Sequence, residues 1–344
     1  MTASRHSRRG IIVPFLIVGL ALAGWTGWWF YLTQEIETRL AAQVETMRAD
    51  GWTITHGEVT TTGWPFRARV DIPLVSALAP SGHGVDALEL VAETNAYNPD
   101  RWVVLAPKGL TVTRAGKGKV SITGDGARFS ISHLRDRFPD VRVELIRPIF
   151  TPHTGAEPFP IASADRVELY TRPHLTDGVQ STDELDVLFI LTDARGRPGG
   201  PVAGAAQQGH LSLKLETVIQ QASRLSGADA AGVFGNWTRA GGRFTRVLGE
   251  VSAGESRAVL SSAVLSAGPD GRLQGDLAVK AEKPMAAISG LAGSSSGPVN
   301  QMGATGAAAA TAVRGDQPID LVVRFERGRT WLGPFALAPA PKLF

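Results

Sequence analysis

The sequence predicts a mainly β protein with minor α content, preceded by a single N-terminal membrane-spanning helix. Two observations lead to this fold class: an uncharged apolar run over residues 10–32, and alternation of apolar and polar residues in most segments after residue 51. No segment of helix length separates most of these alternating segments, which favours an antiparallel meander over a parallel βαβ fold. We therefore expect a transmembrane helix, an amphipathic stalk helix, and then a large curved antiparallel β-sheet or meander with a few short helices.

The apolar run reads GIIVPFLIVGLALAGWTGWWFYL, which is long enough to cross a hydrocarbon core of about 30 Å as a helix. Residues 1–9 form a basic tail without an acidic residue, which predicts a cytoplasmic N-terminus. The C-terminal domain is then expected in the periplasm, anchored in a bacterial inner membrane. A cleaved signal peptide is the alternative, because Ala21-Leu22-Ala23 fits a cleavage pattern.

Aromatic residues gather at the far end of the apolar run. Their amphipathic rings are of the kind that settle at the depth of lipid headgroups. The expected membrane-interface residues are Trp25, Trp28, Trp29 and Tyr31.

Composition limits the functions open to the rest of the chain. The 344 residues carry a formal net charge of +3, but three of the 35 basic residues and none of the 32 acidic residues lie in residues 1–32. The exported part is therefore neutral, which argues against a nucleic-acid partner. The chain has no cysteine, so disulfides, thiolate metal sites and cysteine nucleophiles are excluded.

Changes in periodicity and composition divide the chain after the membrane span. Residues 33–50 are expected as an amphipathic stalk helix, and residues 51–193 as a first β-rich half. Residues 194–208 are rich in Gly, Pro and Ala and are expected as a loop between two halves. Residues 209–344 form a second β-rich half with small-residue helices at 286–314. Disorder in the Gly/Ser-rich middle of that last stretch is the alternative.

No constellation of residues predicts a catalytic, cofactor or metal site. The stretch Gly293–Gly297 matches the nucleophile-elbow pattern G-x-S-x-G, but no strand precedes it, so a flexible loop is expected. The seven histidines lack the spacing of metal ligands. Because no nucleophile and base can be paired from the sequence, we expect a protein that is not an enzyme and has no cofactor.

Two aromatic turns and one helical tryptophan are expected to have structural roles. A Trp-Pro turn stands before an alternating strand, and a similar Gly-Pro-aromatic element stands in the last hairpin. Both turns are expected to close the ends of a sheet, with the lining of a lipid groove as the alternative. The residues of these motifs are Trp64, Pro65, Phe66, Trp237, Gly333 and Pro334.

Several short motifs follow one another in a distinctive order after the membrane span. They are Gly51-Trp52-Thr53, Gly63-Trp64-Pro65-Phe66, Asn236-Trp237-Thr238-Arg239-Ala240-Gly241-Gly242, Gly271-Arg272-Leu273-Gln274-Gly275 and Leu332-Gly333-Pro334-Phe335-Ala336-Leu337-Ala338-Pro339. This order resembles the bacterial domain of unknown function 2125 family over most of the chain after residue 33. The resemblance implies an envelope location and no assigned activity. In style the chain is also similar to AsmA-like envelope proteins, which are anchored in the inner membrane and hold long curved sheets with an apolar inner face.

These observations favour an inner-membrane-anchored, periplasmic, β-rich protein of the cell envelope that binds lipid or another apolar ligand without catalysis. The expected partners are the inner membrane, phospholipid or another apolar ligand, and envelope proteins. A structural or scaffolding envelope component that binds partner proteins is the first alternative. An envelope hydrolase is the second.

Overall fold

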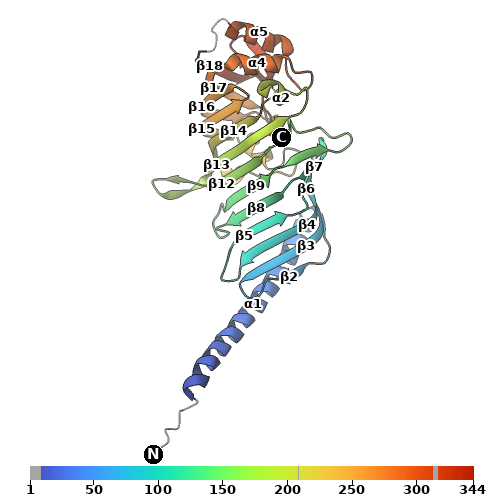
Figure 1. The fold of residues 1–344 in the computed structure, drawn as a ribbon, viewed down its shortest axis with the longest axis vertical. Coiled ribbons are helices and arrows are strands. Elements are labelled where there is room, and N and C mark those ends of the chain that lie inside the picture. Colours follow the sequence, from blue (N-terminus) through green and yellow to red (C-terminus); the bar gives the residue numbers. More distant parts are fainter. Residues whose placement is uncertain (1–8, 208, 313–316) are drawn as a thin grey trace, which may run out of the picture.

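The computed structural model describes residues 9–207, 209–312 and 317–344, with side chains from Ile12 onward. A long β-rich body is built on one protruding helix (Figure 1). Residues 1–8 of the expected basic tail lie outside the described residues.

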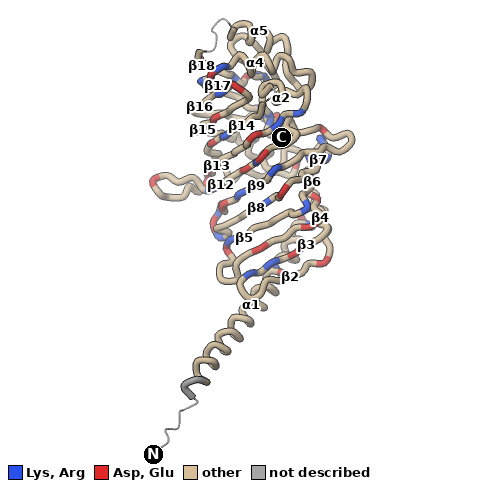
Figure 2. The backbone as a smooth tube through the Cα atoms, viewed as in Figure 1, with Lys and Arg blue, Asp and Glu red and all other residues tan. Residues whose placement is uncertain are grey.

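Helix α1, Arg9–Ala49, is continuous. The membrane span predicted at 10–32 and the stalk predicted at 33–50 are therefore parts of one helix. Gly51 ends it with a φ of 86°, and the N–H of Trp52 donates to the carbonyl of Met47 at 3.0 Å. From Ile12 onward α1 is long and apolar enough to span a membrane. Figure 2 shows that the part of α1 outside the body carries no charged residue from Ile12 onward.

The alternating segments form strands of one antiparallel sheet, which has 20 strands over the described residues. This confirms the predicted fold class. The strands of the half nearer to α1 are β1 Thr53–Thr55, β2 Thr60–Thr62, β3 Arg67–Leu78, β4 Gly84–Asn95, β5 Asn98–Ala106, β6 Leu110–Arg114, β7 Gly118–Thr123, β8 Gly126–Ser132, β9 Asp140–Ile146 and β10 Ile149–Pro152. The remaining strands are β11 Ile161–Ser163, β12 Arg166–Thr176, β13 Val179–Gly196, β14 Leu211–Gln220, β15 Arg243–Ala253, β16 Ser256–Ala267, β17 Leu273–Glu282, β18 Ile319–Glu326, β19 Arg329–Leu332 and β20 Phe335–Pro339.

The sheet divides at β4 and rejoins at β13. The start of β4 pairs with β6, while its end pairs with β5. One branch runs through β5, β8, β9 and β12, and the other through β6, β7, β10 and β11. Both branches pair with β13, so these strands close a hydrogen-bonded ring. Beyond the ring, β14 to β18 pair only with their neighbours in sequence.

Five short helical segments accompany the sheet: α2 Pro201–Ala206, the 3₁₀ turn η1 Ala222–Arg224, α3 Phe234–Arg239, α4 Pro284–Ala292 and α5 Gln301–Ala312. Helices α2, α4 and α5 gather at the end of the body farthest from α1 (Figure 1). Small residues allow this close packing: a Cβ on Gly290 would lie 1.8 Å from the carbonyl oxygen of Gly204.

The segment predicted as a loop over residues 194–208 is largely ordered as regular structure. Strand β13 continues to Gly196 and α2 begins at Pro201, while residue 208 lies outside the described residues. Strand β13 pairs with β14 across the expected boundary, so the sheet is continuous there. The Gly, Pro and Ala composition reflects a tightly packed small-residue helix, which composition alone does not distinguish from a loop. The helices expected in 286–314 are present as α4 and α5, with residues 313–316 outside the described residues.

Candidate functional site

One face of the sheet carries apolar side chains from the strand beside α1 to the far end of the body. The strand register places them in a single row that crosses the strands from β3 to β18. At the interstrand spacing of about 4.8 Å, this row is roughly 50 Å long. Its members are Val70, Ala92, Val104, Phe129, Val143, Leu169, Phe189, Leu215, Gly249, Leu260, Val279 and Leu321.

The middle of this row is only partly covered by the rest of the protein. Phe129 is 37% exposed, and its neighbours in the row are half-buried rather than buried. We call these central residues the apolar strip: Val104, Phe129, Val143, Leu169, Phe189 and Leu215. A sheet face packed against a second layer would bury such side chains fully, so the strip has apolar surface left over.

Packed clusters border the apolar strip on both sides. On one side, Leu145 and Val167 pack against Val120, Ile122 and Phe150 of the second branch. On the other side, Leu185 and Ile219 pack against Trp237 of α3, which is fully buried. The far end meets the helices, where Leu321 and Val323 pack with Ile288 and Ala307.

The near end of the row meets α1. Ala68 is fully buried against Trp29 and Leu32, and it lies on the same face of β3 as Val70. The helix that could span a membrane and the apolar face of the sheet are therefore in direct contact.

Three tryptophan side chains attach α1 to the end of the body. Their acceptors lie in the connection between β2 and β3, in the connection between β4 and β5, and at the first residue of β3. The indole N–H of Trp25 donates to the carbonyl of Pro65 at 2.7 Å, that of Trp28 to Ala96 at 3.0 Å, and that of Trp29 to Arg67 at 2.8 Å. Buried or half-buried carbonyls need hydrogen-bond donors. These bonds therefore stabilise the backbone of the body as well as the position of α1.

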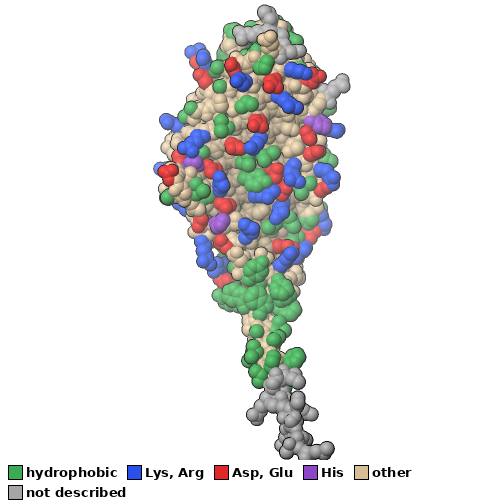
Figure 3. All heavy atoms as spheres, turned by 60° about the vertical axis from the view of Figure 1, so that its left-hand side comes forward, with side chains coloured by type: hydrophobic (Ala, Val, Ile, Leu, Met, Phe, Trp, Pro, Cys, Tyr) green, Lys and Arg blue, Asp and Glu red, His purple; other side chains and the backbone are tan. Residues whose placement is uncertain are grey.

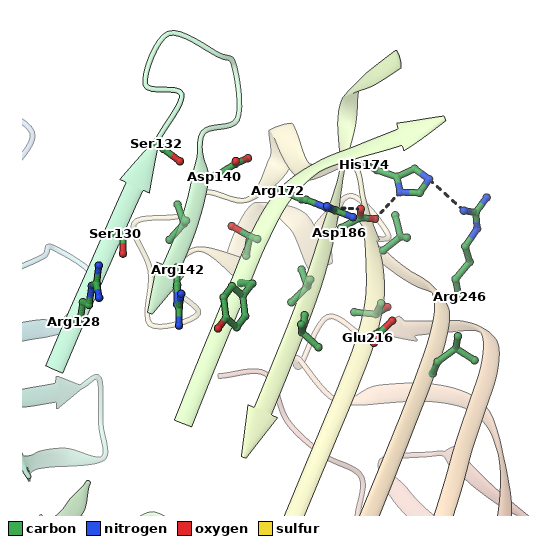
Figure 4. A pocket seen from close by; sticks show the side chains of 18 of the residues that line it. Arg128, Ser130, Ser132, Asp140, Arg142, Arg172, His174, Asp186, Glu216 and Arg246 are labelled. Atoms are coloured by element: carbon green, nitrogen blue, oxygen red, sulfur yellow. Dashed lines mark hydrogen bonds and ion pairs between the residues drawn. The ribbon is translucent and has the colours of Figure 1, made fainter. Parts of the chain in front are cut away.

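The opposite face of the sheet holds a hollow of about 760 Å³, which is lined by charged and polar side chains together with apolar ones such as Leu188 and Leu248 (Figure 4). His174, which is 8% exposed, lies with its Nδ1 2.6 Å from Asp186 Oδ1. The Nε of Arg172 donates to the other oxygen of Asp186 at 3.2 Å, and Nη1 of Arg246 lies 3.3 Å from Nε2 of His174. These residues come from β12, β13 and β15, and the dashed lines in Figure 4 follow them.

A second polar network lies on the same face around Arg142. Its Nη2 is 3.3 Å from Glu168 and 3.4 Å from Glu144, two carboxylates that are themselves buried. The guanidinium also stacks 4.8 Å from the centre of the Tyr170 ring. The hydroxyl of Tyr170 donates to Glu168 at 2.6 Å. Burial, together with this hydrogen bond to a carboxylate, raises the pKa of Tyr170 above its usual range.

In both polar networks, side chains of opposite charge lie beside one another. An Asp–His pair orients a histidine in many hydrolases, but there the second ring nitrogen faces a hydroxyl or thiol. Here the group beside Nε2 of His174 is the guanidinium of Arg246. Within residues 12–207, 209–312 and 317–344, no three His, Asp or Glu side chains gather as potential metal ligands.

The predicted membrane-interface residues have different surroundings. Trp28 and Tyr31 are 42% and 58% exposed, whereas Trp29 is only 7% exposed and Trp25 is half-buried. A position at the headgroup layer stays a prediction for all four, and the indole bonds to the body were not foreseen. They could not be, because the acceptors are backbone carbonyls that carry no sequence signal.

The predicted structural motifs also differ in how far their side chains are buried. Gly333 and Pro334 make the turn between β19 and β20, and Trp237 lies at the centre of a packed cluster. The N–H of Arg67 donates to the carbonyl of Gly63, so the backbone closes the turn before β3. The side chains of Trp64 and Phe66 do not take part in that closure, since they are 49% and 67% exposed. Pro65 accepts the hydrogen bond from Trp25 described above.

The apolar strip was not identifiable from the sequence. Alternation within each strand indicates which side chains share a face, but the row depends on the register between strands.

A bacterial family model described as "Uncharacterized protein conserved in bacteria (DUF2125)" matches residues 29–341, in agreement with the resemblance in the motifs. No curated protein and no solved structure matches the chain.

Proposed function

Because the chain belongs to this uncharacterised bacterial family, and α1 is apolar enough to span a membrane, we propose that it is an envelope protein that binds lipid acyl chains on the apolar strip. The observation that carries the proposal is the partly exposed apolar row that begins at α1 and crosses the sheet. Acyl chains are the occupant that fits, because a bilayer supplies them at the near end of the row and the strip offers them no polar group.

The location follows from the charge pattern around α1. Basic residues before the span favour a cytoplasmic N-terminus, so the body lies in the periplasm and α1 in the inner membrane. The protein acts as a binding module rather than an enzyme.

Photo-crosslinking of the full chain in phospholipid vesicles tests the proposal. A benzophenone amino acid at Phe129 faces the apolar strip, whereas the same probe at Ser130 lies on the opposite face of the same strand. We expect crosslinks to phospholipid at position 129 and none at position 130. Equal crosslinking at both positions, or none at either, would contradict acyl-chain binding on the strip.

A scaffolding role has one observation in its favour. The β12–β13 hairpin projects from the body (Figure 1), and Leu175 and Val179 near its tip are 46% and 70% exposed. Exposed apolar residues on a projecting hairpin suit a contact with another envelope protein. Crosslinking in cells from position 179 would yield a discrete protein adduct if the hairpin binds a partner, and none if it does not.

A further inference from the structure

The end of the body beside α1 carries an exposed aromatic cluster. Trp64 and Phe66 belong to the connection before β3, and Tyr97 lies between β4 and β5. They are 49%, 67% and 68% exposed. We call these three residues the aromatic tip. Figure 3 shows hydrophobic side chains gathered where the body meets the helix, while charged side chains cover the body above.

The aromatic tip is held at a fixed place along α1. The two connections are tied to each other by the N–H of Ala96, which donates to the carbonyl of Phe66 at 2.9 Å. Both are tied to α1 through the indole bonds of Trp25, Trp28 and Trp29. The depth of α1 in a membrane therefore sets the depth of the tip.

The length of α1 brings the tip to the membrane. Between Ile12 and Gly24, before the first tryptophan that binds the body, the helix rises only roughly 20 Å. A hydrocarbon core of about 30 Å is longer than that segment. For α1 to fill the core, the hydrocarbon must extend along the helix nearly to Trp28 and Trp29. The indoles of these two residues hydrogen-bond the part of the body that carries the tip.

From this geometry we propose that the aromatic tip inserts into the headgroup layer of the bilayer that α1 spans, as a second membrane contact. Aromatic side chains prefer this layer. The occupant is the phospholipid bilayer. The inference goes beyond acyl-chain binding on the strip and does not require it.

Spin labels on the full chain measure the depth of the tip. Because the chain has no cysteine, Phe66→Cys, Tyr97→Cys and Val179→Cys each give one labelling position. All three side chains are at least 67% exposed, so the substitutions remove little packing. Each labelled protein is reconstituted in vesicles of phosphatidylethanolamine and phosphatidylglycerol. Collisions with oxygen, which concentrates in the bilayer, are compared with collisions with a water-soluble nickel chelate.

We expect oxygen collisions to dominate at positions 66 and 97, and nickel-chelate collisions to dominate at position 179. Dominant nickel-chelate collisions at either tip position would overturn the proposal, because the rigid tip carries both side chains together. Low collision rates with both reagents at 66 and 97, as contact with a second copy of the chain would produce, would also overturn it. A tip that inserts while the strip binds no lipid would leave this inference intact and contradict only the proposed function.

Discussion

At the scale of single residues, Trp237 shows how one side chain joins three parts of the chain. Its ring is fully buried, lies 4.9 Å from the ring centre of Phe244 and 5.8 Å from that of Phe234, and its N–H donates to Gln220 at 2.7 Å. The sequence predicts a helix around this tryptophan. It does not predict the partners, because Gln220 and Phe244 belong to strands that only the sheet brings together.

Trp237→Phe tests the value of that indole hydrogen bond. The phenyl ring leaves the carbonyl of Gln220 without its side-chain donor and leaves space in the cluster, so we expect a loss of about 1–3 kcal/mol of unfolding free energy. Denaturant unfolding of the full chain in detergent measures it. The control is Trp331→Phe, whose longer 3.3 Å bond to Glu326 is exposed, with an expected change of about 0.5 kcal/mol or less. Equal losses in both variants would contradict the argument.

Tyr170 gives a prediction about pH. Burial first, and then the hydrogen bond to Glu168, raise the pKa of the phenol in the folded state above its ordinary value of about 10. The contribution to stability is therefore complete below the unfolded pKa and is lost as the pH rises through the folded pKa.

An alkaline absorbance titration tests this, because the chain contains only three tyrosines. We expect the Tyr170→Phe variant to lose the late component, which is the part of the absorbance change that occurs at the highest pH. Glu168→Gln should move that component to lower pH, because it removes the negative charge beside the phenol. If the late component persists in Tyr170→Phe, it belongs to another tyrosine, and the prediction for Tyr170 is wrong.

At the scale of elements, the small-residue helices close the end of the body that is farthest from α1. The contact between Gly290 of α4 and Gly204 of α2 leaves no room for a side chain. Close backbone approach of this kind requires glycine at the contact. Composition predicted the existence of helices in 286–314. It did not predict α2, because six residues of Pro, Val, Ala and Gly resemble a loop until their packing partner is known.

Gly290→Ala should therefore separate α4 from α2. The added Cβ would meet the carbonyl of Gly204, and we expect faster amide hydrogen exchange in both helices without global unfolding. The matched control is Gly293→Ala, because a Cβ there finds its nearest atoms at 3.6 and 3.7 Å, an ordinary contact. Protection of α2 and α4 that is unchanged in Gly290→Ala would contradict this close contact.

At the scale of the whole molecule, the apolar row joins elements that the sequence presents as separate. Period-two alternation predicted most of the strands and their polar and apolar sides, for example Ala68 to Ile72 and Val141 to Leu145. Phe66, which continues the first pattern, lies before β3 and is exposed instead. The branching at β4 was beyond prediction, since pairing between β4 and β6 or between β11 and β13 has no local signature. The row is therefore a property of the register, which emerges only when all strands are placed.

Interrupting the row at its centre tests whether lipid passes along it. Leu169→Glu puts a charge in the apolar strip, so lipid crosslinking from a probe at Leu260 should be lost while a probe at Val104, nearer to α1, keeps it. The control is Leu188→Glu, which places the same charge on the opposite face of the sheet, on the neighbouring strand. Unchanged crosslinking at position 260 in Leu169→Glu would show that lipid reaches the far end by another route.

The closed ring of strands also makes the two halves of the sheet differ in how they can assemble during folding. From β13 to β18 every strand pairs with its neighbours in sequence, so that half can assemble by adding one hairpin at a time. The ring, which holds most strands of the half nearer to α1 and also β11 to β13, must bring Ile161 to Gly196 and Gly84 to Thr113 before its second branch is complete. Non-local pairings carry a loop-closure entropy and slow the search. The half synthesised first is thus the slower one to complete, and its apolar surface stays exposed longest during biogenesis.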